Sequence, residues 1–195
     1  MKKSAILTAL SIGVLSMSVA FANPAAVAQV RNNSVEVMKI LNQANGNNNA
    51  QVLRQAEAYA APYFDFEGMT ALAVGMPWRK ATPAQKSQLV TLFKDRLINQ
   101  YAQAMSAYKG AKVEVSDKTV KRGNSVIVQA KITPVGKPVI DAQFMTRPSD
   151  GKYRIYNATF AGVSPIDGYK IQFRDIINKK GIDGLIADLR AKNGR

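Results

Sequence analysis

The chain has 195 residues with neither histidine nor cysteine, and its 27 Lys and Arg against 13 Asp and Glu give a formal net charge of +14. These absences exclude thiol nucleophiles, imidazole bases and disulfides, and they remove the usual zinc and copper ligands. We therefore expect no metal, no cofactor and no enzyme activity, and a protein that binds a molecule rather than transforming it. The positive charge predicts attraction to an anionic membrane, a lipid headgroup or an acidic protein, or serves solubility alone.

An export signal is predicted at the start of the chain. Lys2 and Lys3 precede a mostly apolar, uncharged stretch over residues 5–19, and Ala20-Phe21-Ala22 forms a small-x-small cleavage site. The stretch is short for a membrane-spanning helix, which needs about 20 residues, and an uncleaved N-terminal anchor is the alternative. We expect cleavage after Ala22, a periplasmic location, and a single domain over residues 23–195. Export argues against nucleic acid as a partner.

Helical spacing of apolar residues predicts three helices in the first part of the mature chain, over residues 24–44, 50–61 and 66–74. The longest predicted helix follows, with Thr82 as its N-cap, and Gln85 completes a capping box. One apolar stripe continues along this helix at spacings of three and four residues, formed by Leu89, Phe93, Leu97, Tyr101, Met105 and Tyr108.

Alternating apolar residues then predict four strands joined by short glycine-containing turns. The alternations run through residues 113–115, 126–132, 140–144 and 153–157. In the last of these, Tyr153, Ile155 and Asn157 are expected to share a face. Two helical segments, 169–179 and 182–192, end the chain. This order predicts an α+β fold, in which helices pack on a twisted antiparallel four-stranded meander that can curl around an apolar interior.

The chain offers little for catalysis. Asp65 and Glu67 leave a paired-carboxylate glycosidase mechanism formally open, although nothing else in the sequence supports it. Ser164 is not part of a Gly-x-Ser-x-Gly elbow, and a serine after a strand is typically a turn or helix-cap residue. The long apolar stripe and the inward face of the sheet enclose either an ordinary filled core or a cavity for an apolar ligand.

Three segments, taken together, follow a specific pattern. They are Phe64-Asp65-Phe66 continuing through Met69-Thr70 and Gly75 to Trp78-Arg79, then Tyr101-Ala102-x-Ala104-Met105-x-x-Tyr108, and finally Gly162-Val163-Ser164 with Tyr169, Phe173 and Gly181-Ile182-Asp183-Gly184-Leu185. In this order they resemble the MlaC family, also called the toluene-tolerance or Ttg2 auxiliary family, over essentially the whole mature chain. The sequence departs from the family pattern at Lys170, Tyr153 and Asn157, where arginine, tryptophan and aspartate are common.

The resemblance implies a cone like that of nuclear transport factor 2, with extra helices and an apolar cavity. It also implies a periplasmic carrier that binds phospholipid acyl tails. Such a carrier shuttles lipid between an outer-membrane lipoprotein complex and an inner-membrane ABC transporter complex, and so maintains outer-membrane lipid asymmetry. The bound phospholipid is cargo and not a cofactor. We expect a monomer that comes transiently close to membranes.

Apolar residues from the helices and the sheet are expected to line or gate the lipid pocket: Met69, Leu72, Trp78, Phe93, Leu97, Tyr101, Met105, Val128, Phe144, Ile155, Val163, Tyr169 and Phe173. Two alternatives stay open. The chain could be an exported binder of another apolar small molecule, or an envelope interaction protein with a filled core that binds an acidic partner.

Overall fold

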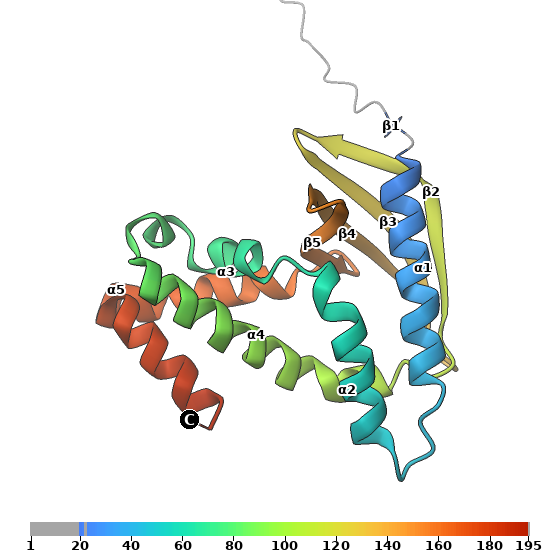
Figure 1. The fold of residues 1–195 in the computed structure, drawn as a ribbon, viewed down its shortest axis with the longest axis horizontal. Coiled ribbons are helices and arrows are strands. Elements are labelled where there is room, and N and C mark those ends of the chain that lie inside the picture. The colour runs from blue at the N-terminus through green and yellow to red at the C-terminus, as the bar shows by residue number, and fades with distance from the viewer. Residues whose placement is uncertain (1–19, 22, 195) are drawn as a thin grey trace, which may run out of the picture.

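The computed structural model describes residues 20–21 and 23–194, and gives the backbone alone for residues 20–21 and 101–106. One antiparallel sheet lies beside α1, and a helical part containing α3, α4 and α5 extends away from it (Figure 1). In chain order the elements are β1 (Ala20–Phe21), α1 (Pro24–Leu41), α2 (Asn49–Ala60), η1 (Ala61–Tyr63), α3 (Phe66–Val74), η2 (Met76–Lys80), α4 (Pro83–Ser106), β2 (Lys112–Arg122), β3 (Ser125–Thr133), β4 (Ile140–Ser149), β5 (Lys152–Phe160) and α5 (Pro165–Lys192). Most of the predicted leader, including Ala22, lies outside the described residues, so its cleavage stays a prediction.

The sheet has the order β1-β2-β3-β4-β5 with antiparallel neighbours throughout. The predicted four-stranded meander is confirmed as β2 to β5, because each pair of successive strands is joined by a short turn. β1 adds two residues beside β2, where Ala20 pairs with Val120. The α+β class predicted from the order of periodicities is therefore confirmed.

The predicted alternation in β5 is wrong at one residue. Met145 of β4 pairs with Asn157, whereas the next residue, Thr146, pairs with Ile155. Tyr156 is thus the extra residue of a β-bulge, which shifts the alternation by one position. Asn157 consequently lies on the face opposite to Ile155. A bulge has no signature in an alternating apolar pattern, so the sequence could not reveal it.

The predicted helices agree with the structure to within a few residues, except at the C-terminus. The capping box at the start of α4 is confirmed, with the Thr82 N–H donating to Gln85 Oε1 at 3.0 Å and the Gln85 N–H donating to Thr82 Oγ1 at 3.2 Å. The last helix begins at Pro165, four residues before the predicted start, because Ser164 caps it. It runs to Lys192 with a kink at Gly181, where the two predicted segments meet.

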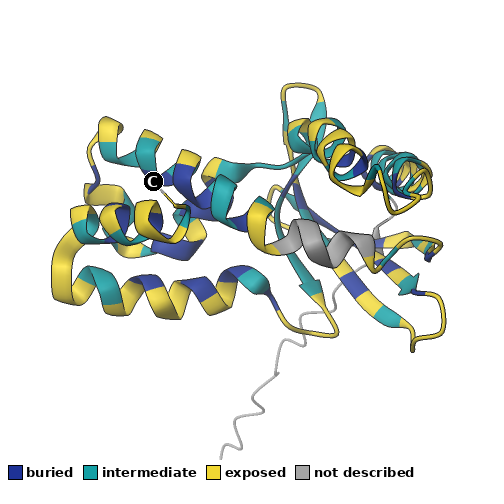
Figure 2. Ribbon diagram, turned by 90° about the horizontal axis from the view of Figure 1, so that it is seen from below, coloured by how far each residue is buried: buried dark blue, intermediate teal, exposed yellow. Residues whose placement is uncertain are grey.

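Three apolar clusters hold the described residues together, and the third packs α1 against α2 around Leu41, Val52 and Ala56. The main cluster lies between α3, α4 and α5 and includes Phe93, Phe173 and Leu185, while the second joins α1 to β3. Figure 2 shows the buried positions gathered between the helices, with exposed positions on their outer sides. No helix within residues 23–194 combines the length and apolar character needed to cross a bilayer.

Candidate functional site

One face of the sheet, here called the inner face, is the side covered by α1. Val126 and Val128 of β3 lie in the same cluster as Val27 and Val30 of α1. Val128 pairs with Phe144 of β4, so Phe144 points to the same side. Phe144 contacts the main cluster and the second cluster, and it is half-buried. It therefore connects the core beneath α1 with the core of the helical part.

At and beyond the edge of the strip covered by α1, the inner face carries further apolar side chains that are only half-buried. The register places them in phase with Val126 and Val128, because successive cross-strand partners share a face. This inner-face patch consists of Val113, Val115, Ile132, Ile140 and Phe144. Half-buried apolar residues on one sheet face form a surface that an apolar ligand can cover, which a fully packed core does not offer.

Six of the predicted pocket residues lie in the main cluster: Met69, Phe93, Leu97, Ile155, Tyr169 and Phe173. The rings of Phe93 and Tyr169 meet edge to face with centroids 4.9 Å apart, and those of Phe93 and Phe173 are 5.0 Å apart. Phe93 is 0% exposed. The Tyr169 hydroxyl donates a hydrogen bond to Gln100 Oε1. These residues make a densely packed aromatic core.

The remaining predicted residues are dispersed. Val128 belongs to the second cluster and Phe144 to the border between the two. Trp78 is half-buried against the main cluster, whereas Leu72 is 40% and Val163 69% exposed. Tyr101 and Met105 fall in the last turns of α4, whose side chains lie outside the described part of the chain. The structure thus brings part of the set together and leaves its role in binding a prediction.

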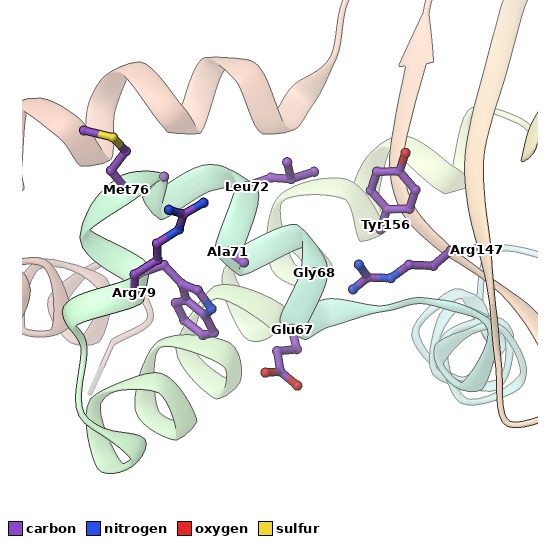
Figure 3. Close-up of a pocket in the computed structure, with 10 residues that line it drawn as sticks. Glu67, Gly68, Ala71, Leu72, Met76, Arg79, Arg147 and Tyr156 are labelled. Atoms are coloured by element: carbon purple, nitrogen blue, oxygen red, sulfur yellow. The ribbon is translucent and has the colours of Figure 1, made fainter. Parts of the chain in front are cut away.

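A groove of about 490 Å³ runs along α3 and η2 (Figure 3). Its walls are formed by Glu67, Gly68, Ala71, Leu72, Gly75, Met76, Trp78, Arg79, Arg147 and Tyr156. Arg147 follows the inward-facing Thr146 by one position, which places it on the outer face of the sheet, and Tyr156, the extra residue of the bulge, lies beside it. The guanidinium carbon of Arg147 lies 5.5 Å from the centre of the Tyr156 ring. This groove is separate from the inner-face patch.

Asp65 anchors the sheet end of this groove. Its Oδ1 accepts a hydrogen bond from the Gly68 N–H at 2.8 Å and so caps α3, and its Oδ2 accepts one from Arg147 Nε at 2.6 Å. A second contact joins Arg147 Nη2 to the same oxygen. The sequence left Asp65 open as a catalytic carboxylate but holds no signal for its partner Arg147, which is 82 residues away.

Titratable and metal-binding chemistry is sparse. Among the residues that the structure describes, no group of three or more acidic side chains lies close enough to hold a metal ion. Burial, and then the neighbouring Tyr63, raises the pKa of the Tyr59 phenol above its ordinary value. The Tyr59 hydroxyl donates to Asn33 Oδ1 at 3.2 Å, which ties α2 to α1.

Comparison with known proteins places these features in a family. A family model described as MlaC protein matches residues 29–191. The chain is 26% identical over 133 residues to the intermembrane phospholipid transport system binding protein MlaC of Haemophilus influenzae, covering 66% of this chain and 62% of that protein. It is 24% identical over 123 residues to the toluene tolerance protein ttg2D of Pseudomonas putida, covering 63% of this chain and 57% of that protein. Both matches span less than two thirds of the relatives.

A solved structure extends the similarity to the fold. It is that of a phospholipid-binding protein from Ralstonia solanacearum, determined in complex with a phospholipid. The two chains are 26% identical, superpose with a TM-score of 0.72, and the alignment covers 87% of this chain and 97% of that one. The resemblance expected from the sequence segments is therefore confirmed, and the chain belongs to the MlaC protein family.

Proposed function

We propose that this protein is a periplasmic phospholipid carrier. It takes up the two acyl tails of a phospholipid and moves the lipid between an outer-membrane lipoprotein complex and an inner-membrane ABC transporter complex. In this way it contributes to outer-membrane lipid asymmetry. The observation that carries the proposal is the similarity to a protein solved with a phospholipid, which extends over 97% of that chain.

The physical need for such a carrier follows from the cost of wetting acyl tails. Each CH₂ group removed from water is worth about 0.8 kcal/mol, so two tails of about 15 methylenes each cost on the order of 20 kcal/mol to expose. A lipid therefore crosses an aqueous compartment only while its tails are covered. Covering them needs an apolar surface and neither a catalytic group nor a cofactor.

The inner-face patch is the best candidate for the surface that receives the tails. Phe144 and Ile132 are half-buried there, so covering them with an acyl chain gains apolar contact. The aromatic core around Phe93 and Phe173 is already filled, and a tail could enter only by unpacking rings that are 0% and 2% exposed. We therefore assign the tails to the patch and the aromatic core to stability.

Docking completes the proposed cycle. The tails stay shielded during transfer only if a partner complex opens the carrier while covering what is exposed. The excess of Lys and Arg over Asp and Glu, which remains after removal of the predicted leader, favours docking on acidic surfaces, because complementary charge raises association rates. The relatives carry names of binding and tolerance proteins and not of enzymes, which agrees with a carrier.

Native mass spectrometry of the purified protein tests the proposal. The wild type is expected to carry a co-purifying phospholipid or to take one up from vesicles. Ile132→Asp places a charge on the inner-face patch and should abolish lipid retention, since a carboxylate is poorly tolerated among acyl chains. Gln129→Asp, on the same strand but on the outer face and exposed, is the matched control and should retain lipid.

The other candidates give different results in the same experiment. A mass corresponding to another apolar molecule would identify a different cargo. Absence of any lipid in the folded wild type, together with no uptake from vesicles, would leave a filled-core interaction protein as the function. In that case binding to an acidic partner should weaken strongly with salt.

A further inference from the structure

The connection between α3 and α4 carries an exposed apolar residue next to exposed cations. Met76 is 84% exposed, the highest value among the large exposed apolar residues of the described chain, and Leu72 nearby is 40% exposed. Arg79 and Lys80 follow within four residues, and both are exposed. Figure 1 places this connection at the end of the helical part that is remote from the sheet, and Figure 3 shows Met76 and Arg79 together at one end of the groove.

The connection is preorganised. Gly75 adopts a φ of 72°, and Pro77 lies in the first turn of η2. The Trp78 N–H donates to the Gly75 carbonyl at 3.0 Å, and the Trp78 ring packs against the main cluster. Trp78 anchors η2 to the main cluster, and the Met76 side chain of the same turn remains exposed to solvent. A fixed turn presents an apolar side chain without an ordering cost upon binding.

Charge decides what this surface can bind. Arg79 and Lys80 have no ion pair within the described residues. The Lys86 ammonium adds a third cation, 5.5 Å from the centre of the Trp78 ring. Of the acidic residues, Glu67 lines the groove farther along α3, and the Asp183 carboxylate accepts a hydrogen bond from the Gln85 side-chain amide at 2.8 Å. The charge around the exposed Met76 side chain is therefore positive on balance.

We propose that Leu72, Met76, Trp78, Arg79 and Lys80, here called the η2 surface, bind reversibly to an anionic membrane. Arg79 and Lys80 contact lipid phosphates, Met76 enters the headgroup region, and the half-buried Trp78 lies at the level where indole rings favour an interface. An anionic membrane matches this surface because clustered Lys and Arg are attracted to its negative potential, while a neighbouring apolar side chain gains by leaving water. This contact is distinct from the inner-face patch and concerns the membrane surface, not the carried lipid.

Sedimentation with vesicles tests the proposal. Vesicles of phosphatidylethanolamine and phosphatidylglycerol should pellet the wild type, vesicles of phosphatidylcholine should pellet far less, and 0.5 M salt, a roughly 4 Å screening length, should release the protein. Arg79→Gln with Lys80→Gln should lower the partition coefficient about tenfold or more, and Met76→Ser should lower it severalfold. These residues are exposed, so the variants should fold.

Two matched controls locate the effect. Lys121→Gln with Arg122→Gln removes the same charge from exposed positions at the end of β2, on the sheet and away from η2, and Val135→Ser removes an exposed apolar residue, 71% accessible, from the β3–β4 turn. Both should bind vesicles like the wild type. Equal losses in these controls, no loss in the η2 variants, or no preference for anionic vesicles would overturn the proposal. Native mass spectra of the same samples report lipid cargo independently, so failure of the carrier function is seen separately.

Discussion

The side-chain amide of Gln29 pairs with both backbone groups of Tyr153. Its Oε1 accepts a hydrogen bond from the Tyr153 N–H at 2.9 Å, and its Nε2 donates to the Tyr153 carbonyl oxygen. Gln29 lies on α1, and Tyr153 lies on β5, the last strand in the order of the sheet. The amide thus satisfies backbone groups at a sheet edge and fixes α1 across the inner face.

Removing this amide should loosen α1 from the sheet. Gln29→Ala should lower the free energy of unfolding by about 1–3 kcal/mol, because it leaves two half-buried backbone groups without partners. Gln29→Glu keeps the acceptor but loses the donor, so its free energy of unfolding should lie between those of the wild type and Gln29→Ala. Urea denaturation measures both. Gln51→Ala, at an exposed position of α2, is the control, and an equal loss there would contradict the assignment.

Gly68 is required by the ion pair beside it. A Cβ at this position would lie 2.5 Å from Asp65 Oδ2 and 2.6 Å from Arg147 Nη2. Gly68→Ala should therefore destabilise the protein, although Ala is favoured over Gly in helices by about 1 kcal/mol. In an Arg147→Ala background the same substitution should cost less, since one of the two clashes is gone. A double-mutant cycle in urea checks this, and simple additivity would disprove it.

Phe173 and Phe144 should separate stability from lipid binding. Phe173→Ala removes a ring that is 2% exposed and should cost about 3–5 kcal/mol of unfolding free energy. Phe144→Ala removes a half-buried ring of the inner-face patch and should cost less while reducing lipid retention severalfold. Thermal unfolding and native mass spectrometry measure the two effects. Full lipid retention in a folded Phe144→Ala variant would argue against the patch.

The kink in α5 depends on Gly181. Its φ of 67° and ψ of −172° lie in a backbone region that residues other than glycine rarely adopt. Gly181→Ala should cost about 1–3 kcal/mol through backbone strain. A Cβ at Gly168, in the same helix, would meet no heavy atom within 4 Å. Gly168→Ala should therefore raise the free energy of unfolding by up to about 1 kcal/mol. Chemical denaturation should therefore show a lower free energy of unfolding for Gly181→Ala and a higher one for Gly168→Ala than for the wild type.

Tyr59 should contribute to stability at ordinary pH and lose this contribution in base. Burial raises the pKa of its phenol, so the folded state binds the phenolic proton more tightly than the unfolded state. The stabilisation is complete below the ordinary pKa of about 10 and is lost as the pH rises through the higher value of the folded state. Tyr59→Phe should flatten the decline of unfolding free energy above about pH 10, and an unchanged slope would exclude this role.

Local rules made much of the fold predictable. The capping box of Thr82 and Gln85 involves atoms three residues apart, so its geometry is a property of the segment itself. Helical and alternating periodicities likewise reflect which side of one element faces away from water. The β-bulge at Tyr156 breaks that rule, because it depends on how β4 and β5 align and not on either strand alone.

The candidate site was less predictable, because apolar residues of a core and of a binding surface have the same chemistry. Phe93 and Phe144 both fit the apolar pattern, yet one is 0% exposed and the other is half-buried. Their difference arises from neighbours contributed by distant segments. Met76 and Arg79 were also missed as a surface, since their exposure follows from the turn at Gly75 and from the anchoring of Trp78.

The positive charge, the absence of histidine and cysteine, the order of helices and strands, and the family resemblance can all be read from the amino-acid sequence. These properties depend on composition and on short-range spacing, which no packing arrangement changes. The contact between Asp65 and Arg147, the pairing of Gln29 with Tyr153, and the position of Phe144 between two clusters arise only in the folded chain. Burial and long-range pairing depend on all neighbours at once, and those neighbours are fixed only when the sheet and the helices pack together.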